Sequence, residues 1–175
     1  MKDSKLIQKL HSGDKEAAGI IIERYYEDIY RFCLYMVQIE ADAYDITQET
    51  FLKFMKYGSS YKHNNLKGYL LTIARNLCFD YFRNKSQKAA ATDWEELDKH
   101  QTRTDRMAEI EDAVYLKNLL KELSEDIREV VILRTYEEMR FKDIAKIMGC
   151  SLSTAKSRYR LGISQLKRMM ENEYE

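Results

Sequence analysis

Proline is absent from this sequence, and glycine occurs only six times in 175 residues. Because these two residues dominate tight turns, their scarcity argues against a sheet-rich fold with many hairpins. Leucine, isoleucine, lysine, glutamate and methionine are plentiful, which favours helices. We therefore expect an all-α fold, and the hydrophobic content of 45% is ample for burying its cores.

Cysteine is also scarce, with three residues at Cys33, Cys78 and Cys150. Their number is odd, they lie far apart, and each sits inside an apolar helical pattern, which suits neither a disulfide framework nor a zinc site. We interpret them as buried thiols. A redox switch is the alternative, but it is disfavoured because apolar surroundings raise the pKa of a thiol and lower its reactivity.

The sequence lacks the patterns of the common enzyme and membrane classes. Its three histidines, His11, His63 and His100, are widely separated, and no glycine-rich phosphate loop, metal-ligand cluster or nucleophile motif occurs. No apolar run approaches the roughly 18 residues needed to span a bilayer, and the charged start lacks a secretory signal. We expect a cytoplasmic protein with no membrane insertion, no catalytic residues, no metal and no cofactor.

Charge is distributed unevenly although the formal net charge is +0. Residues 1–88 carry 14 basic and 11 acidic side chains, residues 89–112 carry 3 and 8, and residues 113–175 carry 12 and 10. The middle segment is acidic, polar and without sustained apolar periodicity, which is typical of a linker. This pattern predicts two small helical domains, 1–88 and 113–175, joined by a flexible acidic linker over 89–112.

Apolar residues at helical spacing predict four helices on each side of the linker. They are expected over about 4–12, 15–37, 42–57, 65–84, 112–123, 125–136, 142–148 and 152–172. Asp14, Ser124 and Ser151 are expected to cap the helices that follow them. Gly149, at the end of the short seventh helix, can take the positive φ of a turn.

The last two helices have the spacing of a helix-turn-helix, in which small Ala145 permits close packing. Projection of the final helix at about 100° per residue puts one set of residues inward: Ala155, Tyr159, Gly162 and Leu166. The opposite face carries Ser153, Lys156, Ser157, Arg160, Ser164 and Lys167. Between positions 149 and 170 there are five basic residues and no acidic one. A merely solvated face normally mixes both signs, so this asymmetry favours contact with DNA phosphates and base edges in the major groove.

The helix over 42–57 offers a different surface. Projection directs one set of residues towards a core: Tyr44, Thr47, Phe51, Phe54 and Met55. It directs the charged residues outward: Asp42, Asp45, Glu49, Lys53 and Lys56. Ile46 and Leu52 fall among these charges, and exposed apolar groups bracketed by carboxylates favour a protein-binding surface over a merely solvated one.

The helix over 65–84 has two contrasting faces. One is expected to be buried: Leu70, Ala74, Leu77 and Tyr81. The other gathers Thr72, Arg75, Asn76, Phe79 and Arg83, beside a loop with Tyr61, Lys62 and His63. Such a mixture of aromatic rings, amide and cations suits unstacked single-stranded bases. The alternative, that the phenyl rings belong to the core, stays open from the sequence alone.

Four segments together resemble the extracytoplasmic-function (ECF) sigma factors, the smallest members of the bacterial sigma factor superfamily. The segments are Asp42–Phe51, Gly68–Arg83, Leu123–Val131 and Asp143–Arg158. The first resembles the family's polymerase-clamp-binding segment, the second its promoter-melting helix, and the others its second domain. The resemblance implies a region 2 helical bundle and a region 4 helix-turn-helix. It also implies core RNA polymerase and promoter DNA as partners, with an anti-sigma factor as a further expected partner.

The helix faces and the resemblance together assign candidate residues to three sites. Polymerase binding is assigned to Asp42, Asp45, Gln48, Glu49 and Leu52. Recognition of the melted −10 strand is assigned to Tyr61, Lys62, Thr72, Arg75, Asn76, Phe79 and Arg83. Within that set the resemblance places Tyr61 and Asn76 around a flipped base. Recognition of duplex DNA at −35 is assigned to Ser153, Thr154, Lys156, Ser157, Arg158, Arg160 and Lys167.

Two alternative functions stay open from the residues alone. An independent helix-turn-helix regulator would bind duplex DNA, would bind an effector or partner through its first domain, and would usually dimerise on two half-sites. A sigma factor with two dissimilar DNA-binding faces needs no symmetric operator and is expected to be a monomer when free. An enzyme is the most remote alternative, because no catalytic motif occurs.

Overall fold

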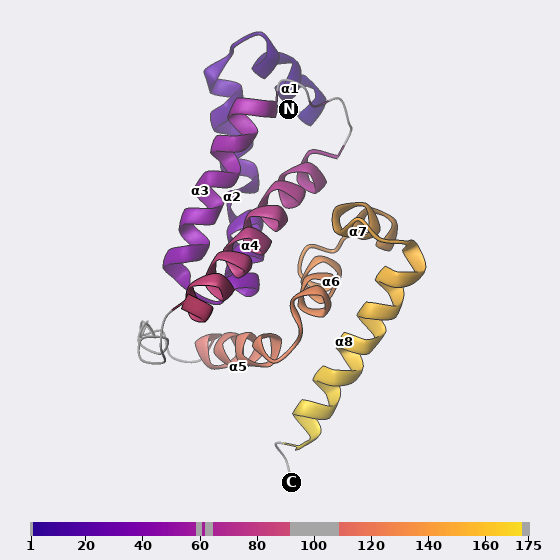
Figure 1. The fold of residues 1–175 in the computed structure, drawn as a ribbon. Coiled ribbons are helices and arrows are strands. Elements are labelled where there is room, and N and C mark those ends of the chain that lie inside the picture. Colours follow the sequence, from indigo (N-terminus) through magenta and orange to yellow (C-terminus); the bar gives the residue numbers. More distant parts are fainter. Residues whose placement is uncertain (1, 59–60, 62–64, 92–108, 173–175) are drawn as a thin grey trace.

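The computed structural model describes residues 2–58, 61, 65–91 and 109–172. All regular secondary structure in this part of the chain is helical, without a strand (Figure 1). In chain order the helices are α1 (Asp3–His11), α2 (Lys15–Val37), α3 (Glu40–Tyr57), α4 (Leu66–Ala91), α5 (Glu109–Lys121), α6 (Glu125–Thr135), α7 (Phe141–Met148) and α8 (Leu152–Asn172). The all-α fold predicted from the sequence is confirmed.

Two of the three predicted capping residues act as expected. The Asp14 carboxylate accepts hydrogen bonds from the backbone N–H groups two and three residues ahead, at 2.9 and 3.4 Å. Ser151 Oγ accepts one from the backbone N–H of Thr154 at 3.1 Å. Ser124 occupies the N-cap position of α6 as predicted, but its side chain makes no capping hydrogen bond.

The helices flanking the predicted linker are longer than their hydrophobic patterns indicate. α4 continues to Ala91 rather than ending near residue 84, and α5 begins at Glu109 rather than at Asp112. The extension of α4 includes three consecutive alanines, which have the highest intrinsic helix propensity. The two ends of the predicted linker are therefore helical, and its middle, 92–108, lies outside the described residues.

The first four helices enclose a core between α2, α3 and α4. Phe32, Phe54 and Leu71, one from each of these helices, are fully buried there. Cys33 and Cys78 are buried as predicted. Cys150 is only partly buried, because it lies in the turn between α7 and α8, so the prediction of a third buried thiol is wrong.

In the second half of the chain, α8 packs along α6 and α7. Gly149 has a φ of +63°, the left-handed conformation expected for the turn before α8. A Cβ added to Gly162 would lie 2.6 Å from Val131 Cγ2 and 2.9 Å from Ile127 Cγ2, both on α6. The absence of a side chain at Gly162 thus allows α8 to lie close against α6, and this contact fixes which face of α8 is exposed.

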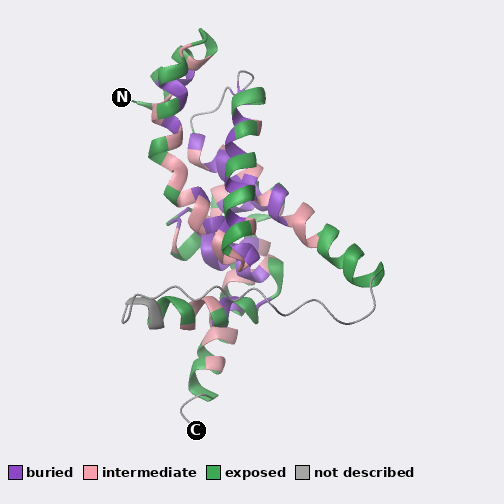
Figure 2. Cartoon of the chain, turned by 90° about the vertical axis from the view of Figure 1, so that its left-hand side faces the viewer, coloured by how far each residue is buried: buried purple, intermediate pink, exposed green. Residues whose placement is uncertain are grey.

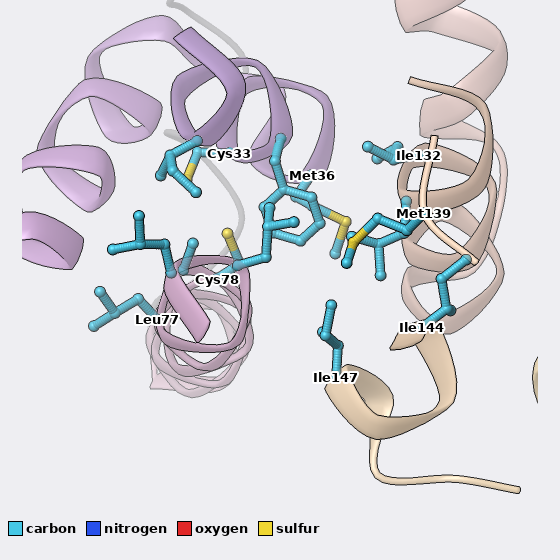
Figure 3. Close-up of a cluster of buried hydrophobic side chains, with 14 of the residues drawn as sticks. Cys33, Met36, Leu77, Cys78, Ile132, Met139, Ile144 and Ile147 are labelled. Carbon is cyan, nitrogen blue, oxygen red and sulfur yellow. The ribbon is translucent and has the colours of Figure 1, made fainter. Parts of the chain in front are cut away.

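The two halves pack against each other through an apolar interface (Figure 3). One side is formed by α2 and α4 and the other by α6, α7 and the turn between them. The buried side chains labelled there are Cys33, Met36, Leu77 and Cys78 from the first half and Ile132, Met139, Ile144 and Ile147 from the second. Figure 2 shows buried residues concentrated where the helices converge, with the outer ends of α4 and α8 exposed.

Candidate functional site

α3 presents an exposed ridge, defined here as Asp45, Gln48, Glu49 and Leu52. Leu52 is 68% exposed although it is a large apolar residue. Glu49 pairs with Lys53 one turn along the helix at 3.5 Å, so the acidic ridge is bordered by a cation. The structure brings these four predicted polymerase-binding residues together on one surface.

The buried face of α3 is rotated relative to the sequence prediction. Ile46, predicted among the charges, is buried, whereas Tyr44 and Met55, predicted inward, are 49% and 42% exposed. Thr47 and Thr50 occupy the core, and their hydroxyls donate to backbone carbonyls four residues earlier at 2.7 and 2.8 Å. Because a satisfied hydroxyl is buried at little cost, the core can include these threonines and exclude two larger apolar side chains.

Asp42, also predicted to bind polymerase, has an internal contact that separates it from the ridge. Its carboxylate accepts a hydrogen bond from the Tyr81 hydroxyl at 2.8 Å, which links α3 to α4. Burial, and then this hydrogen bond, raise the pKa of Tyr81 above its usual range. Tyr81 was predicted to be buried but is only partly so, because its hydroxyl reaches out to Asp42.

The exposed side of α4 forms a surface that we call the α4 face, defined by Arg75, Asn76, Phe79 and Arg83. These residues line an open groove of about 650 Å³, whose other wall includes Glu125 at the start of α6. The Arg75 guanidinium lies 4.5 Å from the centroid of the Phe79 ring, a cation–π distance. Cations, an exposed amide and an aromatic ring therefore occur side by side, as predicted.

Tyr61 and Thr72, which were also predicted for this site, do not join the α4 face. Tyr61 is only 5% exposed, and its ring stacks on Tyr69 with 4.6 Å between the ring centroids. This packing contradicts the expected position of Tyr61 beside the exposed residues. The Thr72 hydroxyl donates to the backbone carbonyl of Gly68 at 2.8 Å, within α4. Lys62 lies outside the described residues.

Arg75 forms an ion pair with Glu129 of α6, a residue for which the sequence indicated no role. The distance from Arg75 Nε to Glu129 Oε1 is 2.6 Å, and the glutamate side chain is fully buried. Burial raises the pKa of Glu129 to about 7, against the opposing effect of the Arg75 charge. Arg75 of the α4 face is thus in contact with a carboxylate from the other half of the chain.

Raising the pH from about 5 to about 8 is expected to weaken the packing around Glu129. The pKa of about 7 in the packed state exceeds the usual 4.5. Between these two pKa values the folded chain keeps a proton on Glu129 that the unfolded chain has lost. The protonated Glu129 therefore stabilises the fold fully below pH 4.5, and this contribution is lost as the pH rises through 7. Over this pH range the free energy of unfolding of the wild type should fall by up to about 3 kcal/mol more than that of Glu129→Gln, because the glutamine cannot titrate.

Urea unfolding of both proteins across this pH range measures the difference. The neighbouring charges that act on Glu129 are Arg75 of α4, Asp126 of α6 and Arg158 of α8. These charges are present in both proteins, so the comparison isolates the titration of Glu129. Parallel pH profiles for the wild type and Glu129→Gln would show that Glu129 does not titrate in this range.

α8 presents the cationic face that the sequence predicts. Its exposed residues include Ser153, Lys156, Ser157, Arg160, Ser164 and Lys167, and its buried residues are Ala155 and Gly162. Two of the candidates have other contacts. The Thr154 hydroxyl lies 2.7 Å from Ser151 Oγ in the helix cap, and Arg158 lies 3.6 Å from an Asp126 carboxylate oxygen on α6. We define the α8 face by the exposed cations Lys156, Arg160 and Lys167, which form no ion pair with another described residue.

Among the described residues, no group of histidine, cysteine and acidic side chains could hold a metal ion. Among the helices described here, none is long and apolar enough to cross a membrane. The arrangement instead offers three separate exposed surfaces, on α3, α4 and α8. An exposed cationic helix within a helix-turn-helix, beside a second helical unit, defines a DNA-binding transcription protein.

Comparisons with known proteins agree with this class. The family model described as "Sigma-70 region 2" matches residues 21–88, and that described as "Sigma-70, region 4" matches residues 113–166. The ECF RNA polymerase sigma factor SigM of Bacillus subtilis is 30% identical over 138 residues, covering 78% of this chain and 85% of the relative. The ECF sigma factor BldN of Streptomyces coelicolor is 26% identical over 174 residues, covering 97% of this chain and 66% of the relative.

A solved structure shows the same fold. The sigma factor RpoE of Bartonella quintana, solved in complex with the anti-sigma factor NepR, aligns with a TM-score of 0.72 and 25% identity. The alignment covers 87% of this chain and 96% of RpoE. The chain belongs to the ECF RNA polymerase sigma factors, and it therefore binds core RNA polymerase and directs promoter-specific initiation of transcription. This is a family of non-enzymatic initiation factors. The comparisons therefore support neither of the two alternative functions, an independent helix-turn-helix regulator or an enzyme.

Proposed function

We propose that the three exposed surfaces divide the work of initiation. The α3 ridge binds core RNA polymerase, the α4 face binds the melted −10 strand, and the α8 face binds duplex DNA at −35. The observation that carries this proposal is the difference in charge between the three surfaces: the α3 ridge carries Asp45 and Glu49, the α4 face carries Arg75 and Arg83, and the α8 face carries Lys156, Arg160 and Lys167. We assign the α3 ridge and the α4 face to region 2, over 1–88, and the α8 face to region 4, over 113–175. The segment 89–112 is the linker between these two regions.

The α3 ridge suits a protein partner. Leu52 offers exposed apolar area, and the exposed carboxylates of Asp45 and Glu49 on the same surface can meet cations of the partner. Such an apolar centre with a charged border is typical of protein interfaces, where charge complementarity sets register and association rate. Asp42 supports this surface by its bond to Tyr81, and we assign it a positioning role.

The α4 face suits unpaired bases because it combines groups that act on any base with one that discriminates. Phe79 and the Arg75 guanidinium can stack on a base, whereas the Asn76 amide both donates and accepts hydrogen bonds. Thr72 and Arg83 border these three residues on the same helix. Tyr61 can join them only when its ring leaves its stack with Tyr69.

Asn76→Ala is expected to cost open-complex formation about 1 to 3 kcal/mol and to reduce discrimination at one −10 position. The measurement is permanganate footprinting of open complexes on promoters varied base by base at −10. Asn84→Ala is the matched control, because Asn84 is also exposed on α4 but does not line the groove. Closed-complex binding at low temperature should not change. Equal losses in closed and open complexes, or an unchanged −10 preference, would remove Asn76 from the site.

The α8 face suits the major groove. Lys156, Arg160 and Lys167 are exposed on one side of a helix that packs closely against α6. Long cationic side chains contact phosphates, and the neighbouring Ser153 and Ser157 hydroxyls can reach base edges. We assign supporting roles at this surface to Arg158, which pairs with Asp126, and to Thr154 in the N-terminal turn.

We also propose that an anti-sigma protein controls this chain in the cytoplasm. The support is the similarity to RpoE, which was solved with its anti-sigma factor. The chain itself catalyses no reaction and needs no cofactor, since RNA synthesis belongs to the polymerase, and it is a monomer when free. Isolation of the chain from unstressed cells should recover a specific protein that competes with core polymerase. Recovery of free, fully active chain would contradict this regulation.

A further inference from the structure

We infer that α1 positions the connection between α3 and α4 for recognition of the −10 strand, and that His11 is the positioning residue. The connection contains Tyr61 and Lys62, two candidates for −10 binding. The region 2 family model matches residues 21–88, so α1 lies outside the matched residues. This role of α1 rests on the proposed −10 site, and it is supported by contacts that α1 and the connection make at the end of α3.

α1 lies at the end of the molecule where α3 ends and α4 begins (Figure 1). Leu6, on the inner side of α1, is fully buried. In the first turn of α1, the Asp3 carboxylate accepts hydrogen bonds from the guanidinium of Arg24 and from the hydroxyl of Tyr25, both on α2 and both at 2.5 Å. α1 is therefore fixed against α2, and its last residue, His11, reaches the end of α3.

His11 contacts the residue at which the connection leaves α3. Its Nε2 lies 3.3 Å from the backbone oxygen of Gly58, and because a carbonyl oxygen can only accept, the imidazole N–H is the donor. The same carbonyl accepts a hydrogen bond from the backbone N–H of Tyr61 at 3.0 Å. Carbonyl groups at the end of a helix lack partners within the helix, so these two donors satisfy the Gly58 carbonyl and fix its direction.

The side chains around Gly58 are closely packed. A Cβ added to Gly58 would lie 2.9 Å from Phe54 Cε2, and Phe54 is fully buried. The Tyr61 ring stacks on Tyr69 with 4.6 Å between centroids, and Tyr69 meets the ring of Phe54 edge-on at 6.2 Å. Burial, and to a lesser extent the charge of Asp3, raises the pKa of Tyr61, so Tyr61 also lies within the influence of α1. The start of the connection is thus held between α1 and the core of the first four helices.

The other end of the connection is held by contacts that do not involve α1. The side-chain oxygen of Asn65 accepts a hydrogen bond from the backbone N–H of Gly68 at 2.9 Å, which caps the start of α4. The backbone carbonyl of Asn65 accepts another from the N–H of Tyr69 at 3.1 Å. Loss of the His11 contact should therefore loosen the start of the connection and leave α4, with Asn76, in place.

A fixed start matters because it reduces the conformational freedom that the connection loses when it binds a base. His11 is exposed, and its contact with Gly58 is a single hydrogen bond, so its removal should not unfold the chain. A typical hydrogen bond corresponds to a factor of about five in an equilibrium constant, and we expect effects of this size.

Hydrogen exchange of the free chain tests the positioning. In His11→Ala the backbone N–H of Tyr61 should exchange roughly fivefold faster, because its acceptor at Gly58 is less fixed, while peptides from α2 and α6 keep their wild-type rates. His11→Gln should restore slow exchange, since the glutamine amide can donate from nearly the same position. Gln8→Ala is the matched control, at an exposed position on the same helix. Wild-type exchange of the Tyr61 N–H in His11→Ala would overturn the positioning role.

Permanganate footprinting of holoenzyme, on promoters varied base by base at −10, tests the consequence for DNA. With His11→Ala, open-complex formation should fall about fivefold and base preference in the −10 block should be relaxed. His11→Gln should recover most of the loss. Closed-complex binding, −35 binding and affinity for core polymerase should match those of Gln8→Ala, because the contacts for these steps lie elsewhere.

Asn76→Ala, measured on the same promoters, separates the role of α1 from the proposed site. An unchanged −10 preference in His11→Ala together with a defect in Asn76→Ala would overturn the role of α1 and leave the proposed site standing. An unchanged preference in both variants would show that the proposed site itself is wrong, and the role of α1 would be overturned with it.

Discussion

Reversal of both carboxylates on the α3 ridge, as Asp45→Arg with Glu49→Arg, is expected to weaken binding to core RNA polymerase by about 3 kcal/mol or more, which is roughly 100-fold. The loss arises because cations of the partner would face cations at two neighbouring positions. Both residues are exposed, and Glu49 loses only its pairing with Lys53. The free energy of unfolding should therefore change little.

The control for this variant is Glu23→Arg with Glu27→Arg, an exposed pair at the same spacing on α2. It makes the same change in net charge away from the ridge. Affinity for fluorescent core polymerase, measured at matched salt, should be lost for the α3 variant and kept for the α2 variant. Equal affinity of the two variants would show that α3 is not the docking surface.

Reversal of two cations on the α8 face, as Lys156→Glu with Arg160→Glu, is expected to reduce holoenzyme binding to −35 duplex DNA by roughly 100-fold or more. Each lost phosphate contact removes counterion release and lowers the slope of log affinity against log salt by about 1, so the slope should fall by about 2. Lys117→Glu with Lys121→Glu on α5 makes the same charge change elsewhere. A salt slope that is the same in both double variants would contradict a phosphate-binding role for α8.

Much of the architecture follows from local sequence signals. The periodicity of apolar residues locates every described helix, and Asp14, Ser151 and Gly149 fix helix ends because their effects act within a few residues. The α8 face is predicted well for the same reason. One side of α8 packs on α6 and the other faces solvent, so a simple helical projection separates Ala155 from Lys156.

Projection fails where a helix has neighbours on more than one side. α3 packs against both α2 and α4, and satisfied threonine hydroxyls occupy positions in its core. The pattern therefore places Tyr44 and Met55 on the wrong side. Tyr61 shows the same limit, because its stack on Tyr69 is a contact between a loop and a helix that neither segment encodes alone.

The buried charges could not be assigned to partners from the sequence. Arg128 and Glu129 fall within an otherwise apolar stretch of α6, and Glu137 follows it, which is a signal that these charges have partners. Their partners lie far away in the sequence: Arg75 is 54 positions from Glu129, and Arg31 is 106 positions from Glu137. Only the packing of the two halves brings these groups together.

Run-off transcription on a library of promoter fragments, with core RNA polymerase and the purified chain, tests the central claim most directly. With the wild-type chain, initiation should occur at fragments that share two sequence blocks, one near −10 and one near −35. The Asn76→Ala chain should relax preference in the −10 block alone, and the Lys156→Glu with Arg160→Glu chain should lose dependence on the −35 block alone. Initiation no higher than that of core polymerase by itself, or both variants affecting the same block, would contradict the account.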